Sequence, residues 1–365
     1  MKKMKFNSEQ LFSLMTIFLI GTAGFLEPAK SAKQDSWIAI LISLLCGLLL
    51  YRIYMAIYHN DPSSSLIKFL QIAWGKYLGG FVGLIYIIYC IYIAARVLRD
   101  FSEVISTVAL EMTTIFTITI LMMFLLIYTV IKGFTTFART VWICFLFTSA
   151  IITLLLFCQL IAGFFSLDRL RPVLENGWSP VLHTVFPTTI SLPFGEVVVF
   201  LLLMHHFDRP HKSTKVGSFA IVTAGIFLAT SSIIHLGNLG VDLIEASNFP
   251  VLSSVSLINI GDFFTRLESL AVISFVILGF IKISVFFFGA VSGTVELFHL
   301  QHHQLITFFI GIIILFFSYF GTGSYFEHEK IGFEIIPKYV HVPLQIIIPI
   351  LLLITINLQK KFSFS

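Results

Sequence analysis

The sequence has few charged residues and few cysteines for its length. Only 12% of its 365 residues are charged, while 57% are hydrophobic and the mean hydropathy is +0.96. A soluble domain is typically about 25% charged. Because a soluble protein cannot hide this much apolar surface, the composition predicts a polytopic membrane protein. The net charge of +4 is modest, and the sequence contains no RNA- or DNA-binding motif, so we expect no nucleic-acid partner.

Several kinds of chemical site are also missing. The four cysteines are isolated in apolar stretches, which argues against a disulfide framework or a zinc site. His299, His302 and His303 we interpret as part of a solvated loop, since no cysteine or paired acid completes a metal shell. There is no P-loop, no hydrolase motif and no nucleophile–base pair. We therefore expect no enzyme activity, no cofactor and no metal.

Long apolar runs dominate what remains. A bilayer requires about 20 apolar residues per helix, and the sequence offers ten such segments, which predict an all-α integral membrane fold with both termini on one side. The predicted spans are Gln10–Pro28, Trp37–Tyr58, Leu78–Leu98, Thr114–Ile131, Arg139–Phe164, Val185–Phe207, Gly217–Leu236, Phe263–Phe287, Leu305–Phe320 and Val342–Leu358.

The distribution of charge predicts which side the termini occupy. Cytoplasmic loops of membrane proteins are enriched in Lys and Arg. If each charged residue is assigned to its nearer side, most of the 23 Lys and Arg residues, Lys282 included, fall with the termini, and most of the 19 acids fall opposite. We therefore predict that both termini are cytoplasmic.

The connections between the spans are short. Those at 165–184 and 237–262, and the stretch 65–75, are long enough for short amphipathic helices. With no low-complexity linker, we expect residues 1–365 to form a single membrane domain, organised as possible inverted repeats at 10–164 and 185–358.

The first predicted span is interrupted by small residues and a proline. Gly21, Thr22, Ala23 and Gly24 are followed closely by Pro28. Irregular backbone is tolerated at membrane depth only where it is buried in protein or lines a polar cavity. An unwound segment here would expose amide and carbonyl groups to a ligand carboxylate and ammonium. The alternative is a close helix contact, because small residues let helices approach one another.

The sixth span carries Pro187, Pro193 and Gly195, together with the acid Glu196. Interrupted helices at equivalent positions of two halves point to a substrate site near the membrane midplane. An ionisable group inside a membrane is costly and usually functional. Glu196 would pair with a ligand ammonium or a cation, or take up a proton; alternatively it caps the amides of the resumed helix. The other candidate ligand-binding residues of this span are Thr188, Ser191, Phe194 and Gly195.

The third span places Tyr86, Tyr89, Tyr92 and Arg96 on one side of a helix, within an arc of about 120°. Such a face would line a cavity, and we include Tyr89 among the ligand-binding candidates. Alternatively the tyrosines pack in the bundle and Arg96 extends to the interface.

The eighth span opens with three further charges. Asp262 and Arg266 are four residues apart and can pair on a helix. Glu268 cannot face Arg266, so we expect it to pair with Arg96 of the third span. These four residues are candidate structural or coupling charges.

Local motifs across nearly the whole chain resemble those of one family. Their order and spacing are similar to those of the B subunit of GerA-type spore germinant receptors, the spore permease family within the amino acid–polyamine–organocation superfamily. The matching segments are Gln34–Trp37 (QDSW), Leu170–Leu174 (LRPVL) with Gly177 and Pro180, Pro193–Glu196, Phe249-Pro250, and Arg266–Glu268.

The resemblance implies a LeuT-like 5+5 inverted repeat in which spans one, three, six and eight surround a central pocket. It implies a small-molecule germinant, often an amino acid, and a location in the inner membrane of an endospore. It also implies two partners, a larger membrane A subunit and a lipoprotein C subunit. Glu27 departs from the apolar residue that we expect before Pro28 in many relatives.

Three functions follow as alternatives. The first is a receptor subunit in which ligand binding at the two interruptions shifts a conformational equilibrium and signals to partner subunits. The second is a proton-coupled amino acid permease in which Glu196 or Glu268 carries the proton. The third is a water or ion conduit that opens during germination. A permease fold can be retained without transport, so the fold alone does not separate them.

Overall fold

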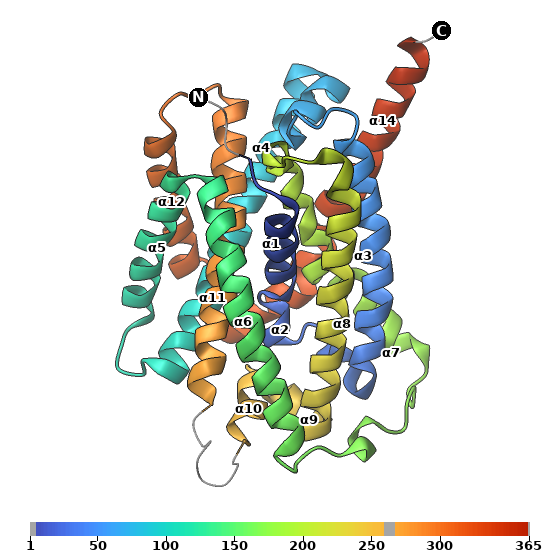
Figure 1. The fold of residues 1–365 in the computed structure, drawn as a ribbon, viewed down its shortest axis with the longest axis vertical. Helices are drawn as coiled ribbons and strands as arrows, with labels where there is room; N and C mark the ends of the chain where they lie inside the picture. Colours follow the sequence, from blue (N-terminus) through green and yellow to red (C-terminus); the bar gives the residue numbers. More distant parts are fainter. Residues whose placement is uncertain (1–4, 259–266, 364–365) are drawn as a thin grey trace.

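The computed structural model describes residues 5–258 and 267–363. Helices joined by turns and loops make up the described part, and its one β-type pairing is an isolated bridge between Phe6 and Phe207. Within these ranges, ten helical segments are long and apolar enough to cross a membrane, and each overlaps one of the ten predicted spans. The prediction of a ten-span helical membrane protein is therefore confirmed. Both termini lie at the same end of the helical bundle (Figure 1).

The first half of the chain supplies the first five spans and the connection to the sixth. Its elements are α1 (Ser8–Ile20), α2 (Ala23–Leu26), η1 (Lys30–Asp35), α3 (Ser36–Tyr58), α4 (Leu66–Val104), η2 (Ile105–Ala109), α5 (Ile115–Lys132), α6 (Phe134–Ile161), η3 (Leu167–Leu170) and α7 (Trp178–His183).

The second half begins with irregular helical turns and ends with the last span. Its elements are η4 (Thr184–Phe194), η5 (Gly195–Leu202), η6 (Met204–His206), η7 (Pro210–Lys212), α8 (Ser213–Leu239), α9 (Val241–Ala246), α10 (Pro250–Ser256), α11 (Glu268–Leu297), α12 (His303–Phe320), α13 (Tyr325–Lys330), η8 (Ile331–Ile335), η9 (Pro337–Ile347) and α14 (Ile348–Ser363).

The helix α1 lies inside the bundle, whereas α5 and α12 lie at its edge (Figure 1). The most extensive helix packing is between α4 and α11, and α1 packs against α6, α8 and α11. Most of α1 is buried, whereas α5 and α12 expose large apolar side chains such as Phe124 and Phe316. The apolar surface of the outer helices suits contact with lipid. Polar groups buried inside the bundle have no water around them, so they must form hydrogen bonds with other parts of the protein.

Local sequence explains how the first span begins and ends. Asn7 and Gln10 form a capping box at the start of α1. The helix ends at Ile20 because the backbone at Gly21 is non-helical, with φ 13° and ψ −121°. Helical turns resume at Ala23 and stop at Glu27, a left-handed residue (φ 46°) directly before Pro28. A residue before proline is disfavoured in the α region, which accounts for the end of α2.

Proline has the same effect twice in the sixth span. Phe186 and Leu192 have extended backbone angles inside η4, and each directly precedes a proline. Pro187 and Pro193 also lack the amide that would continue the helical bonding. The turns from Thr184 to Phe194 are therefore π-type, and Gly195–Leu202 is wound as a tighter 3₁₀ helix.

The short helices predicted in the connections are present. The 165–184 connection contains η3 and α7, and the 237–262 connection contains α9 and α10. The stretch 65–75 is helical from Leu66 up to Gly75, where the backbone (φ 81°, ψ 168°) interrupts α4. In the eighth span, the predicted start at Phe263 lies outside the described residues, and α11 runs to Leu297, well beyond the predicted end at Phe287.

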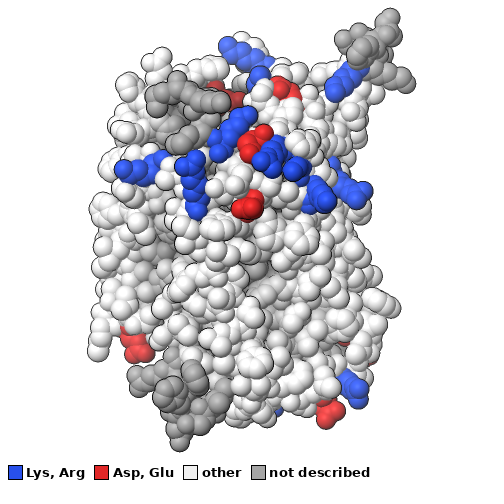
Figure 2. All heavy atoms as spheres, viewed as in Figure 1, with Lys and Arg blue, Asp and Glu red and all other residues white. Residues whose placement is uncertain are grey.

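Charge is distributed unevenly between the two ends of the molecule. In the view of Figure 2, Lys and Arg side chains gather around the end at which both termini lie, and few appear at the opposite end. Between the two ends the visible surface is almost free of charge, as expected for a surface in contact with lipid.

Candidate functional site

A buried ion pair joins the eighth span to the sixth. The Lys282 ammonium of α11 lies 2.6 Å from Glu196 Oε2 of η5, and both side chains are only 1% exposed. Lys282 also donates a hydrogen bond of 2.9 Å to Thr22 Oγ1, in the segment between α1 and α2. Lys282, which the predicted charge distribution counts with the terminal side, is therefore buried inside the bundle and not at a membrane surface.

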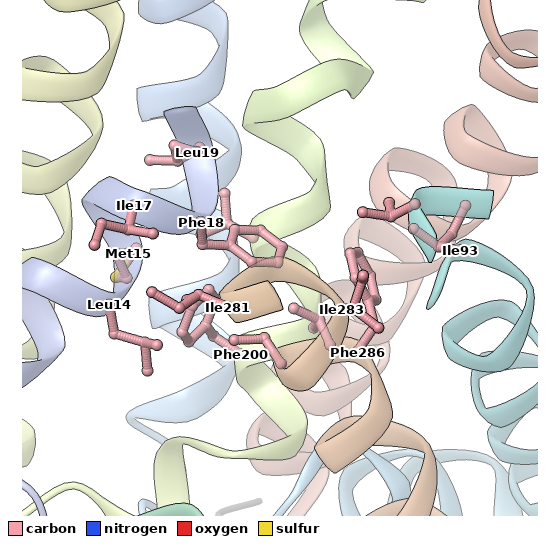
Figure 3. Close-up of a cluster of buried hydrophobic side chains, with 14 of the residues drawn as sticks. Leu14, Met15, Ile17, Phe18, Leu19, Ile93, Phe200, Ile281, Ile283 and Phe286 are labelled. Carbon is pink, nitrogen blue, oxygen red and sulfur yellow. The ribbon is translucent and has the colours of Figure 1, made fainter. Parts of the chain in front are cut away.

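The first span is shaped around this lysine. A Cβ atom added at Gly21 would lie 2.8 Å from Lys282 Cδ and 2.8 Å from the Phe18 carbonyl oxygen, so glycine leaves the space through which the lysine passes. The ammonium lies 5.5 Å from the centre of the Phe18 ring. Phe18 itself packs with Phe200 and Phe286 in the apolar cluster shown in Figure 3. Apolar surroundings of this kind make the loss of either charge partner costly.

A cavity with a volume of about 60 Å³ lies beside the ion pair, and we call it the central cavity. It brings together the predicted residues Thr22, Arg96 and Glu196 with residues that sequence reasoning did not select. Its lining is Thr22, Leu26, Ile93, Arg96, Val97, Asp100, Leu192, Glu196, Tyr325, Glu329, Gly332, Phe333, Ile336 and His341.

The short helix α13 contacts Arg96 and Asp100, two further charged residues that line this cavity. Asp100 Oδ1 lies 3.0 Å from His328 Nε2. Arg96 donates to the His328 carbonyl oxygen at 2.6 Å and to the Tyr92 hydroxyl at 3.3 Å. Glu329 pairs with Lys30 at 2.5 Å. These contacts hold α13 over the end of α4.

Tyr325, at the start of α13, also lines the cavity, and nearby carboxylates affect the pKa of its hydroxyl. Burial raises the pKa of its hydroxyl well above the usual value, and the carboxylates of Asp100 and Glu329 raise this pKa further. Its hydroxyl therefore stays protonated and keeps its proton available for donation.

A larger open depression lies next to the central cavity, with a volume of about 710 Å³. The two share Glu329 and Phe333 in their linings. The depression is also lined by Pro28, Lys30 and Thr188, which follow the first span and begin the sixth. It therefore opens at the end of the bundle away from the termini, and the Lys30–Glu329 ion pair stands between it and the central cavity.

Tyr89 belongs to a separate buried network of polar side chains. Its hydroxyl lies 2.9 Å from His341 Nδ1 and accepts a hydrogen bond of 2.9 Å from Gln345 Nε2. Gln345 packs so closely on Gly195 that an added Cβ there would come within 2.1 Å of Gln345 Oε1. Gly195 thus makes room for Gln345, and His341 links this network to the central cavity.

The remaining residues of the first interruption line a different space. Ala23, Gly24 and Phe194 line a second, smaller cavity of about 20 Å³ together with Glu27. The Glu27 carboxylate makes a short hydrogen bond with His235 Nδ1 of α8. Five of the predicted ligand-binding residues thus line these two cavities: Thr22 and Glu196 the central one, and Ala23, Gly24 and Phe194 the second. The two cavities share Leu192 in their linings.

The other predicted residues have varied surroundings. Thr188 donates to the Phe333 carbonyl oxygen at 3.2 Å, and Ser191 is fully buried with no hydrogen-bond partner among the described residues. Arg96 and Glu268 form no ion pair in the described part of the chain, and Arg96 bonds instead to α13. Asp262 and Arg266 lie outside the described residues.

Sequence reasoning missed Lys282, Asp100, His328 and His341. A usable signal existed for Lys282, since the rule that singled out Glu196, an ionisable group deep in an apolar run, applies equally to it. Asp100 and His328 gave no such signal, because Asp100 lies just beyond the predicted end of the third span at Leu98 and His328 lies in the connection between the ninth and tenth spans.

These features define a class: a helical multi-pass membrane protein with a buried, charged cavity that residues of its first, third and sixth spans line. The chain belongs to the spore germination protein family, whose model matches residues 5–325. This confirms the resemblance found in the sequence at the level of the family.

Individual relatives carry the same description over most of their length. Spore germination protein KB of Bacillus subtilis (strain 168) is 34% identical over 363 residues, covering 99% of this chain and 97% of the relative. Spore germination protein A2 of the same organism is 23% identical, covering 99% and 98%. Spore germination protein XB of Bacillus anthracis is 24% identical, covering 76% and 78%.

Proposed function

We propose that this chain is the germinant-binding membrane subunit of a spore germination receptor. A small molecule, with an amino acid as the first candidate, would bind in the central cavity where the first and sixth spans are interrupted. Binding would shift a conformational equilibrium and signal to partner subunits. The observation that carries this proposal is the contact of Lys282 with both interruptions, through Thr22 and Glu196, beside a cavity with charged walls.

We propose a LeuT-like arrangement for the bundle, with residues 1–365 as one domain and repeats at 10–164 and 185–358. Support comes from the non-helical backbone at Gly21 and Leu192, at the predicted positions of the first and sixth spans. The packing of α4 and α11 beside these segments is also as expected for spans three and eight around a central site.

We place both termini in the cytoplasm, in the inner membrane of a spore. Support comes from the Lys and Arg side chains gathered at the terminal end (Figure 2). In this orientation the open depression faces outwards, so a germinant arriving from outside reaches Lys30 and Glu329 first. The A and C subunits that the family resemblance implies remain the expected partners; the relatives themselves are described as spore germination proteins.

Ligand binding to the purified protein tests the proposal. Amino acids, nucleosides and sugars are screened by thermal shift against the wild type, Glu196→Gln, Thr22→Val and the exposed control Glu111→Gln. We expect one class of solute to stabilise the wild type and Glu111→Gln, with a weaker effect on the two cavity variants. Thr22→Val keeps the ion pair, so it remains informative if Glu196→Gln does not fold. Absence of stabilisation by any solute, in a folded wild type, would refute the proposed site.

A proton-coupled permease is the second candidate, favoured by the ionisable groups buried at the centre. Proteoliposomes containing only this chain distinguish the two functions. Concentrative uptake of a labelled ligand under a proton gradient would show a permease, whereas binding without uptake would show a receptor.

A further inference from the structure

The central cavity contains three carboxylates, and two of them already have a lysine partner. Glu196 pairs with Lys282 at 2.6 Å, and Glu329 pairs with Lys30 at 2.5 Å. A ligand amine at Glu196 would have to displace an ammonium that is also bonded to Thr22. The protein therefore occupies with its own lysine the position that the sequence assigned to the ligand.

Asp100 is the carboxylate left without a lysine or arginine partner among the described residues. Its carboxylate contacts His328 Nε2 through Oδ1. A carboxylate has two oxygens and about four lone-pair sites, so one hydrogen bond leaves most of its accepting capacity free. Because Asp100 lines the central cavity, that capacity is available to a ligand amine.

Arg96 is the matching cation. It also lines the cavity, and it donates hydrogen bonds to two neutral oxygens, the His328 carbonyl and the Tyr92 hydroxyl. A guanidinium has five N–H donors, so two such bonds leave donors for a carboxylate. No acid is within ion-pair distance of Arg96 in the described part of the chain.

The spacing of Arg96 and Asp100 suits a ligand that carries both charges. They are four residues apart on α4, which places them one above the other with about 5–6 Å between Cβ atoms. An α-amino acid carries its carboxylate and ammonium on the same carbon atom, so one molecule can reach both side chains. The ligand would then supply the counter-charge for both Arg96 and Asp100.

We propose that Arg96 and Asp100 form the subsite for the charged groups of a zwitterionic α-amino acid, with the carboxylate at Arg96 and the ammonium at Asp100. Glu196 and Lys282 then neutralise each other and hold the two interrupted spans together. This inference rests on the proposed function, because it names the ligand class and the contacts of the same cavity.

The test compares ligands that lack one charge with variants that lack the matching side chain. The probes are the standard α-amino acids, each with its des-amino carboxylic acid and its decarboxylated amine; for L-alanine these are propionate and ethylamine. Dissociation constants are measured for the wild type, Asp100→Asn, Arg96→Gln and Glu196→Gln. Asp61→Asn, at an exposed loop, is the matched control.

In the wild type, removal of either charge from the ligand should weaken binding about ten- to hundredfold, the usual range for a charge-assisted hydrogen bond. In Asp100→Asn, removal of the ligand amine should no longer weaken binding, whereas removal of the ligand carboxylate should still do so. We call these two losses of affinity the amine penalty and the carboxylate penalty. Arg96→Gln should do the reverse, and Asp61→Asn should change neither. Arg96→Lys, which keeps the charge, should retain a carboxylate penalty if Arg96→Gln does not fold.

The outcomes separate this inference from the proposed function. If an amino acid binds but the amine penalty persists in Asp100→Asn and vanishes in Glu196→Gln, the subsite is overturned and the receptor function stands. Binding of only a nucleoside or sugar has the same consequence. Failure of every solute to bind a folded wild type would overturn both.

Discussion

Two ion pairs in this protein use the same chemical groups in opposite environments. Lys282 and Glu196 lie 2.6 Å apart with 1% of each side chain exposed, at the centre of the bundle. Lys68 and Asp61 lie 3.9 Å apart, with 52% and 42% exposed, at the connection between α3 and α4. The exposed charges interact through water, which solvates each of them whether or not the other is present.

The charges of the buried pair have no water to solvate them if the partner is removed. Transfer of an ion from water into a protein interior costs several kcal/mol, which only a close partner and further hydrogen bonds offset. Lys282 has both, in Glu196 and in the Thr22 hydroxyl. The buried pair therefore holds the first, sixth and eighth spans together, whereas the surface pair contributes little to the stability of one connecting loop.

The largest expected effect is the removal of one buried charge. Lys282→Met leaves the Glu196 carboxylate without a partner inside the bundle, and we expect a loss of about 3–5 kcal/mol in the free energy of unfolding. Lys68→Met, the matched control, should cost about 0–1 kcal/mol because its partner Asp61 stays hydrated. Thermal unfolding in detergent measures both.

A second substitution shows whether the loss comes from the unpaired charge. In the double variant Lys282→Met/Glu196→Gln no charge remains, so stability should return most of the way to the wild type. Equal destabilisation by Lys282→Met and Lys68→Met would contradict the picture of a solvent-excluded centre.

The contrast between local and distant contacts explains what the sequence revealed. The ten apolar spans were predictable because each is encoded in one continuous run of residues. Non-helical backbone at Phe186 and Leu192 follows from the prolines that succeed them. By contrast, the Thr22–Lys282 hydrogen bond joins residues 260 positions apart, and no local pattern specifies it. Arg96 illustrates the same limit, because its partner proved to be the backbone of His328 rather than Glu268.

An intermediate effect is expected when the space for Lys282 is filled. In Gly21→Ala the new methyl group would lie 2.8 Å from Lys282 Cδ and from a backbone oxygen, so the lysine or the chain must shift. Overpacking of this kind typically costs about 1–3 kcal/mol. Because the shift moves the ammonium, ligand affinity should fall as well.

Gly80→Ala is the matched control on α4. Its nearest neighbour would be Leu297 Cδ1 at 3.6 Å, an ordinary contact. Alanine is favoured over glycine inside a helix by up to about 1 kcal/mol, so this variant should be neutral or slightly more stable. If Gly21→Ala is as stable as Gly80→Ala, the close packing of Lys282 on Gly21 is not a constraint on the fold.

The smallest expected effect on stability comes from removing the exposed carboxylate Asp61. It is best detected from the pH dependence of the melting temperature. Hydrogen bonds from Ser63 and Ser64 hold the pKa of the Asp61 carboxyl below its usual value, although burial opposes this shift. A depressed pKa means that the folded state favours the charged carboxylate. Its stabilising contribution is therefore complete above the unfolded-state pKa of about 3.9 and is lost as the pH falls through the folded-state value. Melting temperatures of the wild type and Asp61→Asn should thus differ by a small, constant amount near neutral pH and converge in acid. A difference that grew as the pH was lowered would show that Asp61 is held in its protonated form, and the contrast with the buried pair would then rest on Lys282 and Glu196 alone.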